Sequence, residues 1–169
     1  MDVPALDALP EDAFVAAAAP WFEGAPRFLG RLAADRPFGD ARRLFERAEA
    51  IALAMPEDEQ LELIDAHPRL GAPPATVSAA SFREQGYDRE TTEAIAELER
   101  LNADYEGRFG FRFCVFVAAR PRPALVPVLR EALAADRDAE IRRALHDVVA
   151  IACDRFEREA SDRAAELAR

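Results

Sequence analysis

The spacing of apolar residues along this chain follows the period of an α-helix. In the stretches 44–55, 61–64 and 95–105 apolar side chains recur three or four positions apart, which places them on one helical face. Prolines and glycines separate these stretches, and both residue types interrupt helices. The pattern predicts an all-α fold of roughly seven or eight helices, given the average helix length in soluble domains.

Length and composition predict one domain that covers residues 1–169. The chain has 169 residues, of which 50% are hydrophobic, and this is enough for one sizeable core. No Gly/Ser-rich stretch, internal repeat or break in composition marks a linker. We therefore expect a single compact multi-helix domain.

The longest helix is expected from about Asp138 to about Ala168. An arginine falls on its inward face, and the expected stripe consists of Ile141, Leu145, Val148, Ala152 and Arg155. An arginine on a buried face needs an anion, which can be a carboxylate of the protein or a bound ligand. Both interpretations of Arg155, an internal ion pair and a ligand contact, remain open.

The segment from Phe111 to Val117 breaks the helical pattern. Its β-branched and aromatic residues are typical of a strand. No second run of this kind occurs that could pair with it. We therefore expect a buried helix, or a short extended entry into one.

Charge and cysteine content exclude several classes of partner. The net charge of −10 argues against nucleic acid, because no basic block offsets it. Cys114 and Cys153 have neither the spacing of a zinc site nor that of a disulfide framework, which fits a reducing, cytoplasmic setting. The N-terminal region is acidic, and Pro20 interrupts its apolar run, so it is typical neither of a signal peptide nor of a membrane span. We expect no metal, no cofactor and no membrane contact.

The two histidines are the first candidates for proton transfer, because imidazole titrates near neutrality. His67 begins the pentapeptide His67-Pro68-Arg69-Leu70-Gly71, and Pro68 disfavours helical geometry at the residue before it. The amphipathic stretch 56–66 should therefore end at His67, with the imidazole projecting into a loop. His67 is then either an acid/base group or a cap for the last helical carbonyls. His146 lies off the apolar stripe and is interpreted as a surface residue.

A second polar cluster, Ser81-Phe82-Arg83-Glu84-Gln85, follows in the connecting region. The Ser81-x-x-Glu84 spacing is typical of a capping box, in which both side chains satisfy amides at the start of a helix. Gly86 makes a helix start there less favourable, because glycine costs on the order of 1 kcal/mol against alanine inside a helix. The cluster is either such a cap or part of a polar site.

Four motifs occur in a fixed order along the chain. They are His67-Pro68-Arg69-Leu70-Gly71, Ser81-x-x-Glu84-Gln85, Leu101-Asn102-x-x-Tyr105 with Phe109-Gly110-Phe111-x-Phe113, and the late helix with Ile151-Ala152 and Arg155. In this order they resemble the decarboxylases of 2-oxo-4-hydroxy-4-carboxy-5-ureidoimidazoline (OHCU), which act in urate breakdown. The resemblance spans almost the whole chain. It implies an all-helical, cofactor-independent carboxy-lyase that forms S-allantoin and is commonly a homodimer.

The resemblance also implies roles for individual residues. His67 would be the catalytic acid/base and Glu84 its partner. The implied substrate contacts are Pro68, Ser81, Gln85, Phe113, Cys114, Val115, Phe116, Val117 and Arg155. The small-molecule ureidoimidazoline carries a ring C=N bond that can take up the electrons released with carbon dioxide, so no cofactor is needed as an electron sink.

Two features depart from the family pattern. Arg112 stands where members usually carry proline, and the segment Gly86-Tyr87-Asp88 after Gln85 is shorter than expected. One alternative is therefore a decarboxylase or hydrolase of a different cyclic ureide, and the basic residue could indicate a substrate that carries an extra negative charge. A second alternative is a non-catalytic helical module that binds a partner or a ureide. We expect Arg112 to face solvent rather than the pocket, because it alternates with Phe111 and Phe113.

Overall fold

The computed structural model describes residues 2–71 and 92–167. Within these ranges every regular element is helical and no strand occurs, which confirms the predicted all-α class. The elements are α1 (Val3–Asp7), α2 (Glu11–Ala18), α3 (Pro26–Ala34), α4 (Ala41–Ala54), α5 (Glu57–Ala66), α7 (Thr92–Phe109), the 3-10 helix η2 (Arg122–Leu125), α8 (Val126–Ala134) and α9 (Arg137–Leu167).

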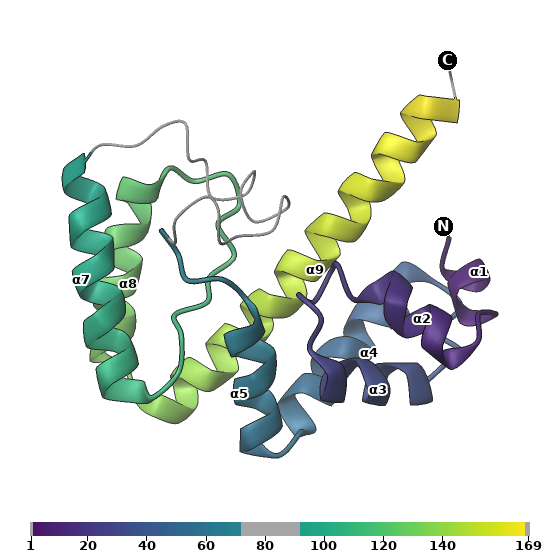
Figure 1. Ribbon diagram of the computed structural model, residues 1–169, viewed down its shortest axis with the longest axis horizontal. Helices are drawn as coiled ribbons and strands as arrows, with labels where there is room; N and C mark the ends of the chain where they lie inside the picture. Colours follow the sequence, from purple (N-terminus) through teal and green to yellow (C-terminus); the bar gives the residue numbers. More distant parts are fainter. Residues whose placement is uncertain (1, 72–91, 168–169) are drawn as a thin grey trace.

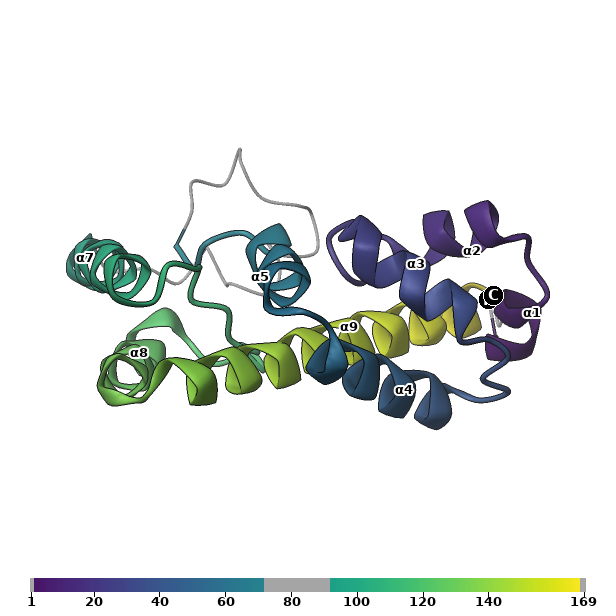
Figure 2. The ribbon, with the colours of Figure 1, turned by 90° about the horizontal axis from the view of Figure 1, so that it is seen from below.

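The long helix α9 runs through the whole molecule and organises it (Figures 1 and 2). Helices α4 and α5 pack against it, α7 and α8 lie near its start, and α1 to α3 lie towards its other end. Its bounds are close to the predicted ones. The predicted inward stripe is confirmed, since all five of its residues, Ile141, Leu145, Val148, Ala152 and Arg155, are buried.

Local sequence explains where several helices begin. The Asp2 side chain accepts a hydrogen bond from the Ala5 amide at 3.0 Å, and the Asp40 side chain accepts one from the Arg43 amide at 2.8 Å. Such N-caps typically stabilise a helix by about 1 kcal/mol. Helix α3 begins with Pro26, whose missing amide would have no helical partner at this position.

Residues 111–117 are extended and belong to no helix. The expectation of a buried helix was wrong, and that of an extended entry is confirmed, because the segment leads to η2. Its aromatic side chains are nevertheless buried: the rings of Phe111 and Phe113 lie 5.5 and 5.2 Å from that of Tyr105, both edge to face.

This segment has no neighbouring strand among the described residues, and side chains of two helices hydrogen-bond to its backbone instead. The Arg112 amide donates to Asp65 on α5 at 2.8 Å, and the Cys114 carbonyl accepts from Arg143 on α9 at 3.0 Å. Buried backbone groups require such partners. The segment is therefore held between two helices without forming a sheet.

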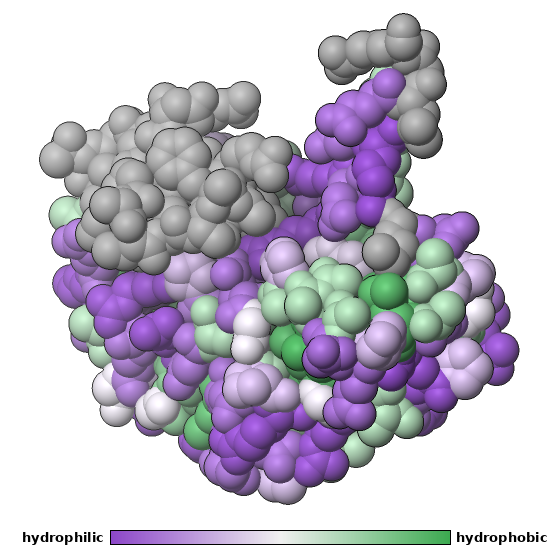
Figure 3. All heavy atoms as spheres, turned by 45° about the vertical axis from the view of Figure 1, so that its right-hand side comes forward, coloured by the Kyte–Doolittle hydropathy of each residue, from purple (hydrophilic) through white to green (hydrophobic). Residues whose placement is uncertain are grey.

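Most of the described surface on the face shown in Figure 3 is hydrophilic. Figure 3 shows that the apolar residues on the visible face gather over the N-terminal helices, whereas the projecting end of α9 is polar. Leu53 is the one large hydrophobic side chain that is exposed among the described residues. No helix in residues 2–71 and 92–167 combines the length and the apolar character that crossing a bilayer requires.

Candidate active site

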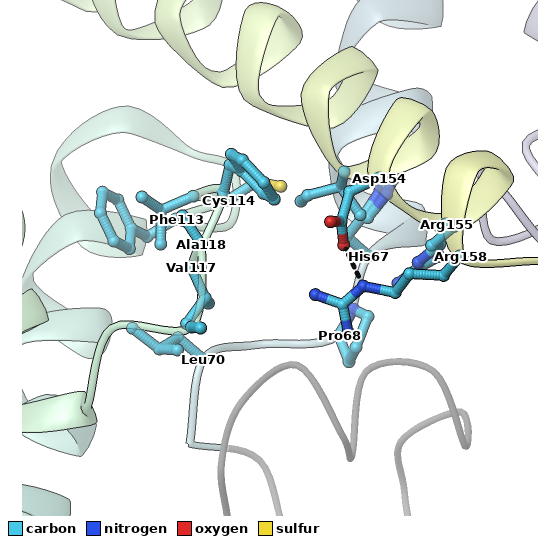
Figure 4. Close-up of a pocket in the computed structure, with 14 residues that line it drawn as sticks. His67, Pro68, Leu70, Phe113, Cys114, Val117, Ala118, Asp154, Arg155 and Arg158 are labelled. Atoms are coloured by element: carbon cyan, nitrogen blue, oxygen red, sulfur yellow. Dashed lines mark ion pairs between the residues drawn. The ribbon is translucent and has the colours of Figure 1, made fainter. Parts of the chain in front are cut away.

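A pocket opens between the end of α5, the extended segment and α9 (Figure 4). Every site residue that the sequence suggested within the described ranges lines it, namely His67, Pro68, Phe113, Cys114, Val115, Phe116, Val117 and Arg155. The remaining candidates, Ser81, Glu84 and Gln85, lie outside the described residues. The pocket is therefore built by chain segments far apart in the sequence.

His67 occupies the C-cap of α5, as Pro68 led us to expect. Its side chain is buried, only 4% exposed, rather than projecting into a loop. Nδ1 lies 3.2 Å from the carbonyl oxygen of Leu63, one turn back along the helix. Because a carbonyl only accepts hydrogen bonds, this contact assigns the proton to Nδ1 and leaves a lone pair on Nε2. Nε2 is buried and has no hydrogen-bond partner within the described part of the chain.

The surroundings of His67 favour its neutral form. Burial, and secondly the positive charge of Arg155, lower its pKa from the ordinary 6.5 to about 4, although Glu23 and the Leu63 carbonyl oppose the shift. The imidazole is therefore neutral at pH 7. The capping and acid/base interpretations are compatible, because the hydrogen bond that caps α5 uses Nδ1 and leaves the lone pair of Nε2 available.

The loop after His67 is anchored to α7. The Asn102 side chain donates to the Leu70 carbonyl at 2.9 Å, and Arg69 forms an ion pair with Glu106. Asn102 is fully buried, so this hydrogen bond is shielded from water. Asn102 belongs to one of the motifs singled out in the sequence, and its position gives that motif a structural role.

The extended wall of the pocket is fixed from α9 by a buried polar network. Arg143 donates to the Cys114 carbonyl, to Asp147 at 2.7 Å and to Glu140 at 2.9 Å. Glu140 also accepts from the Tyr105 hydroxyl at 2.8 Å. Burial is the main cause that raises the pKa of Tyr105 and of Asp147. The network thus fixes the position of the backbone that faces the pocket.

Arg155 lines the pocket and at the same time forms an internal ion pair. Its Nη2 lies 2.9 Å from Glu23 Oε1, and Nη1 donates to the carbonyls of Pro20 and Trp21 at 3.1 and 3.3 Å. The side chains of Arg155 and Glu23 are only 6% and 14% exposed. The anion that the inward arginine requires is therefore a protein carboxylate, and ligand contact by Arg155 remains a prediction.

Arg112 is exposed and does not line the pocket, which confirms the expectation that it faces outwards. Its Nη1 donates to the carbonyls of Asp65 at 2.8 Å and His67 at 3.2 Å. These carbonyls end α5 and lack helical partners, so the arginine caps this helix end. The departure from the family pattern therefore acts on α5 and adds no charge to the pocket wall.

Sequence reasoning missed two charged residues of the pocket, Asp154 and Arg158. They form an ion pair at 2.9 Å, one helical turn apart on α9 (Figure 4). Their spacing from Ile151 and Arg155, which also line the pocket, could have revealed them, because positions three and four apart share one helical face. Within the described ranges, no cluster of histidine, cysteine, aspartate and glutamate could hold a metal ion.

The fold and the pocket define a helical protein with a candidate acid–base site for a small ligand. The family model of the OHCU decarboxylases matches residues 7–157. The chain therefore belongs to the OHCU decarboxylase family.

Similar proteins support this membership. The chain is 34% identical over 134 residues to the uric acid degradation bifunctional protein PucL of Bacillus subtilis. The matched region covers 78% of this chain and 27% of that protein. It thus spans about a quarter of the bifunctional relative. The OHCU decarboxylase of Mus musculus is 30% identical over 132 residues, covering 75% of this chain and 74% of that one. The Haloferax volcanii decarboxylase is 27% identical, covering 85% and 87%.

Two solved structures share the fold. A crystal structure of OHCU decarboxylase in the presence of (S)-allantoin superposes with a TM-score of 0.69 at 21% identity, covering 82% of this chain and 93% of that one. A crystal structure of (S)-allantoin synthase gives a TM-score of 0.66 at 20% identity, covering 90% and 51%.

Proposed function

We propose that this chain decarboxylates OHCU to (S)-allantoin in urate degradation. The observation that carries the proposal is the buried, neutral His67, whose Nε2 lone pair has no partner within the described residues of the pocket. The relatives in Haloferax volcanii and Mus musculus are named for this decarboxylation. The Bacillus subtilis relative is named for uric acid degradation.

The reaction needs proton transfer between neighbouring atoms of the substrate. When the bond to the carboxylate breaks, carbon dioxide leaves and the electron pair moves into the ring C=N bond. The hydroxyl group then loses its proton, so that the carbon that carried the carboxylate becomes a carbonyl carbon. The adjoining carbon takes up a proton. A proton from solvent finally neutralises the ring nitrogen. One base on one face of the ring can serve both carbon and oxygen, and delivery from one face gives a single enantiomer.

His67 is suited to this task once a ligand is bound. With Nδ1 held by Leu63, Nε2 is the atom that accepts the hydroxyl proton and returns it to carbon. A low pKa makes the free imidazole a weak base, but an anionic substrate close to the ring favours the protonated form. Substrate binding therefore raises the basicity of His67 when it is needed.

The pocket wall supplies further polar contacts and limits the access of water. The backbone amide and carbonyl of Val115 make no hydrogen bond within the described part of the chain, so a ureide can pair with them. Phe113 and Val117 contribute apolar surface beside it. We also propose contacts from Pro68 and Arg155 on the opposite side.

Glu84 is proposed as the partner of His67, with Ser81 and Gln85 as ligand contacts, on the strength of the family resemblance. The Glu84→Gln variant separates this role from a capping box. Glutamine also serves in a capping box, so a cap would leave turnover nearly unchanged. A charge partner of the histidine would lower the rate when it is neutralised.

We further propose that residues 1–169 form a single domain, that the protein is a homodimer and that it is cytoplasmic. A single cooperative unfolding transition tests the first point. Sedimentation analysis tests the second, and cell fractionation tests the third. The position of Arg112 outside the pocket lining gives no support to a different, more acidic substrate.

The proposed activity is tested by incubating the pure chain with freshly generated OHCU and recording the release of carbon dioxide. The His67→Asn protein serves as the matched control, since it should keep the fold and lose the base. Equal release by both proteins would overturn the proposed role of His67. No release above the spontaneous rate by the wild-type chain would overturn the decarboxylase assignment.

A further inference from the structure

Asp154 lines the pocket with a carboxylate whose Oδ2 accepts no hydrogen bond from the described residues. Its Oδ2 is shielded from solvent and lies 2.9 Å from Arg158 Nε, close enough for an ion pair but without the alignment of a hydrogen bond. The described structure provides no other hydrogen bond to this carboxylate. Figure 4 shows the Asp154–Arg158 pair on α9, across the cavity from Cys114 and Val117. A shielded acceptor in such a position can accept a hydrogen bond from a ligand.

The two arginines of this wall differ in how firmly they are held. The Arg155 side chain is 6% exposed and pairs with Glu23, which is 14% exposed, whereas the Arg158 side chain is 52% exposed and that of Asp154 25%. Breaking a buried ion pair is strongly destabilising, but an exposed pair one turn apart on a helix contributes little. Arg158 can therefore exchange its protein partner for a ligand at low cost.

The proposed substrate has two groups that match the separated pair. Its ureido arm carries N–H donors, and its carboxylate requires a cation. A carboxylate side chain accepts N–H bonds strongly because the interaction is charge-assisted, but it repels another carboxylate. The ureido arm should therefore lie against Asp154 and the substrate carboxylate against a guanidinium.

We propose that the Asp154–Arg158 pair opens on substrate binding, so that Asp154 accepts the ureido N–H groups and Arg158 donates to the substrate carboxylate. This inference rests on the proposed function. It assigns recognition of the two ends of the ureidoimidazoline to one turn of α9. It also leaves the internal pair of Arg155 and Glu23 intact.

Two smaller ligands isolate the contact with Asp154. (S)-Allantoin keeps the ureido arm but has no carboxylate, and hydantoin has the ring without either group. Calorimetry should show that Asp154→Asn weakens the binding of allantoin roughly 10- to 100-fold, the range for a hydrogen bond to a charged group. Hydantoin affinity should not change. Asp162→Asn is the matched control, because Asp162 is an exposed residue of α9 outside the pocket lining.

The contact with Arg158 is isolated by comparing substrate with product. Arg158→Gln should raise the KM for OHCU roughly 10-fold with a smaller effect on kcat, because it removes binding to a group that the substrate carries before reaction. The affinity of the Arg158→Gln variant for allantoin, which lacks the carboxylate, should equal that of the wild type. An equal loss for allantoin and OHCU would overturn the assignment of Arg158.

The same measurements separate this inference from the proposed function. If the wild-type chain releases carbon dioxide from OHCU but Asp154→Asn changes neither KM nor allantoin affinity, the role of the pair is overturned and the function stands. If the wild-type chain releases none but binds allantoin in an Asp154-dependent manner, the function fails and ureide recognition stands. If Asp154→Asn weakened the binding of allantoin and of hydantoin equally, the proposed role of the Asp154–Arg158 pair would also be overturned.

Discussion

The guanidinium of Arg155 lies 2.9 Å from the carboxylate of Glu23 and joins the last helix to the segment before α3. The two charges act on His67 in opposite directions, since Arg155 lowers its pKa and Glu23 raises it. Burial is the largest cause of the shift. The pair therefore allows an arginine to lie beside the candidate base while a second charge opposes its effect on the pKa of His67.

Neutralising the Glu23 carboxylate should lower the free energy of unfolding. Glu23→Gln removes the carboxylate that pairs with the buried Arg155, and breaking a buried pair in this way typically costs about 3–5 kcal/mol. Denaturant unfolding measures the loss. The Glu23→Gln/Arg155→Met double variant should lose less than the two single variants together, because it removes both charges of the pair. Additive losses would show that the pair is not coupled.

His67→Asn should abolish most of the activity and keep the fold. General acid/base catalysis is typically worth about 10² to 10⁴ in rate. The asparagine amide can still donate towards the Leu63 carbonyl, although His67 is buried and some packing is lost, so a stability loss of about 1–2 kcal/mol is expected. Turnover and thermal melting should be recorded on the same sample. A folded variant with normal turnover would remove His67 from the mechanism.

The stability of the protein should depend on His67 below neutral pH. The folded pKa is about 4, against an ordinary value of 6.5, so between these values the unfolded chain binds a proton that the folded chain does not. Stability should therefore fall as the pH drops from about 6.5 to about 4, by about 3 kcal/mol, and His67 adds no further pH dependence below that. Unfolding of wild type and His67→Asn at stepped pH measures this difference. A difference that does not change with pH contradicts the burial of a neutral imidazole.

Arg112→Pro should affect stability more than turnover. Proline removes the amide that donates to Asp65, and the substitution also removes the guanidinium that caps α5, so a loss of about 1–2 kcal/mol is expected. Arg112→Ala, which keeps the amide, should lose less. Because Arg112 lies outside the pocket lining, kcat/KM should stay near the wild-type value and its salt dependence should not change. A large change in KM would mean that Arg112 reaches the ligand.

Local rules predicted the helical fold, and the family resemblance suggested much of the pocket. The stripe of α9 could be inferred because a period of 3.6 residues determines which side chains share a face. The end of α5 at His67 could be inferred because Pro68 restricts the residue before it. The described residues that the family resemblance suggested do line one pocket, although their roles remain to be tested.

The remaining features depend on contacts between distant segments. Nothing in the spacing pairs Glu23 with Arg155, which are 132 positions apart. Asp154 and Arg158 share a helical face with Ile151 and Arg155, but a charge pair four positions apart is equally typical of a solvated face, so the spacing alone does not identify a pocket. The segment 111–117 is extended because side chains of α5 and α9 bind its backbone, and strand propensity alone does not reveal such partners.

The central claim is tested most directly by the handedness of the product. Freshly generated OHCU should be incubated with the pure chain, and allantoin formation should be followed by circular dichroism against spontaneous decay without protein. The account predicts a rapid rise of the (S)-allantoin signal with wild type and none above the spontaneous background with His67→Asn. Racemic allantoin at the spontaneous rate in the presence of folded wild-type protein would contradict it.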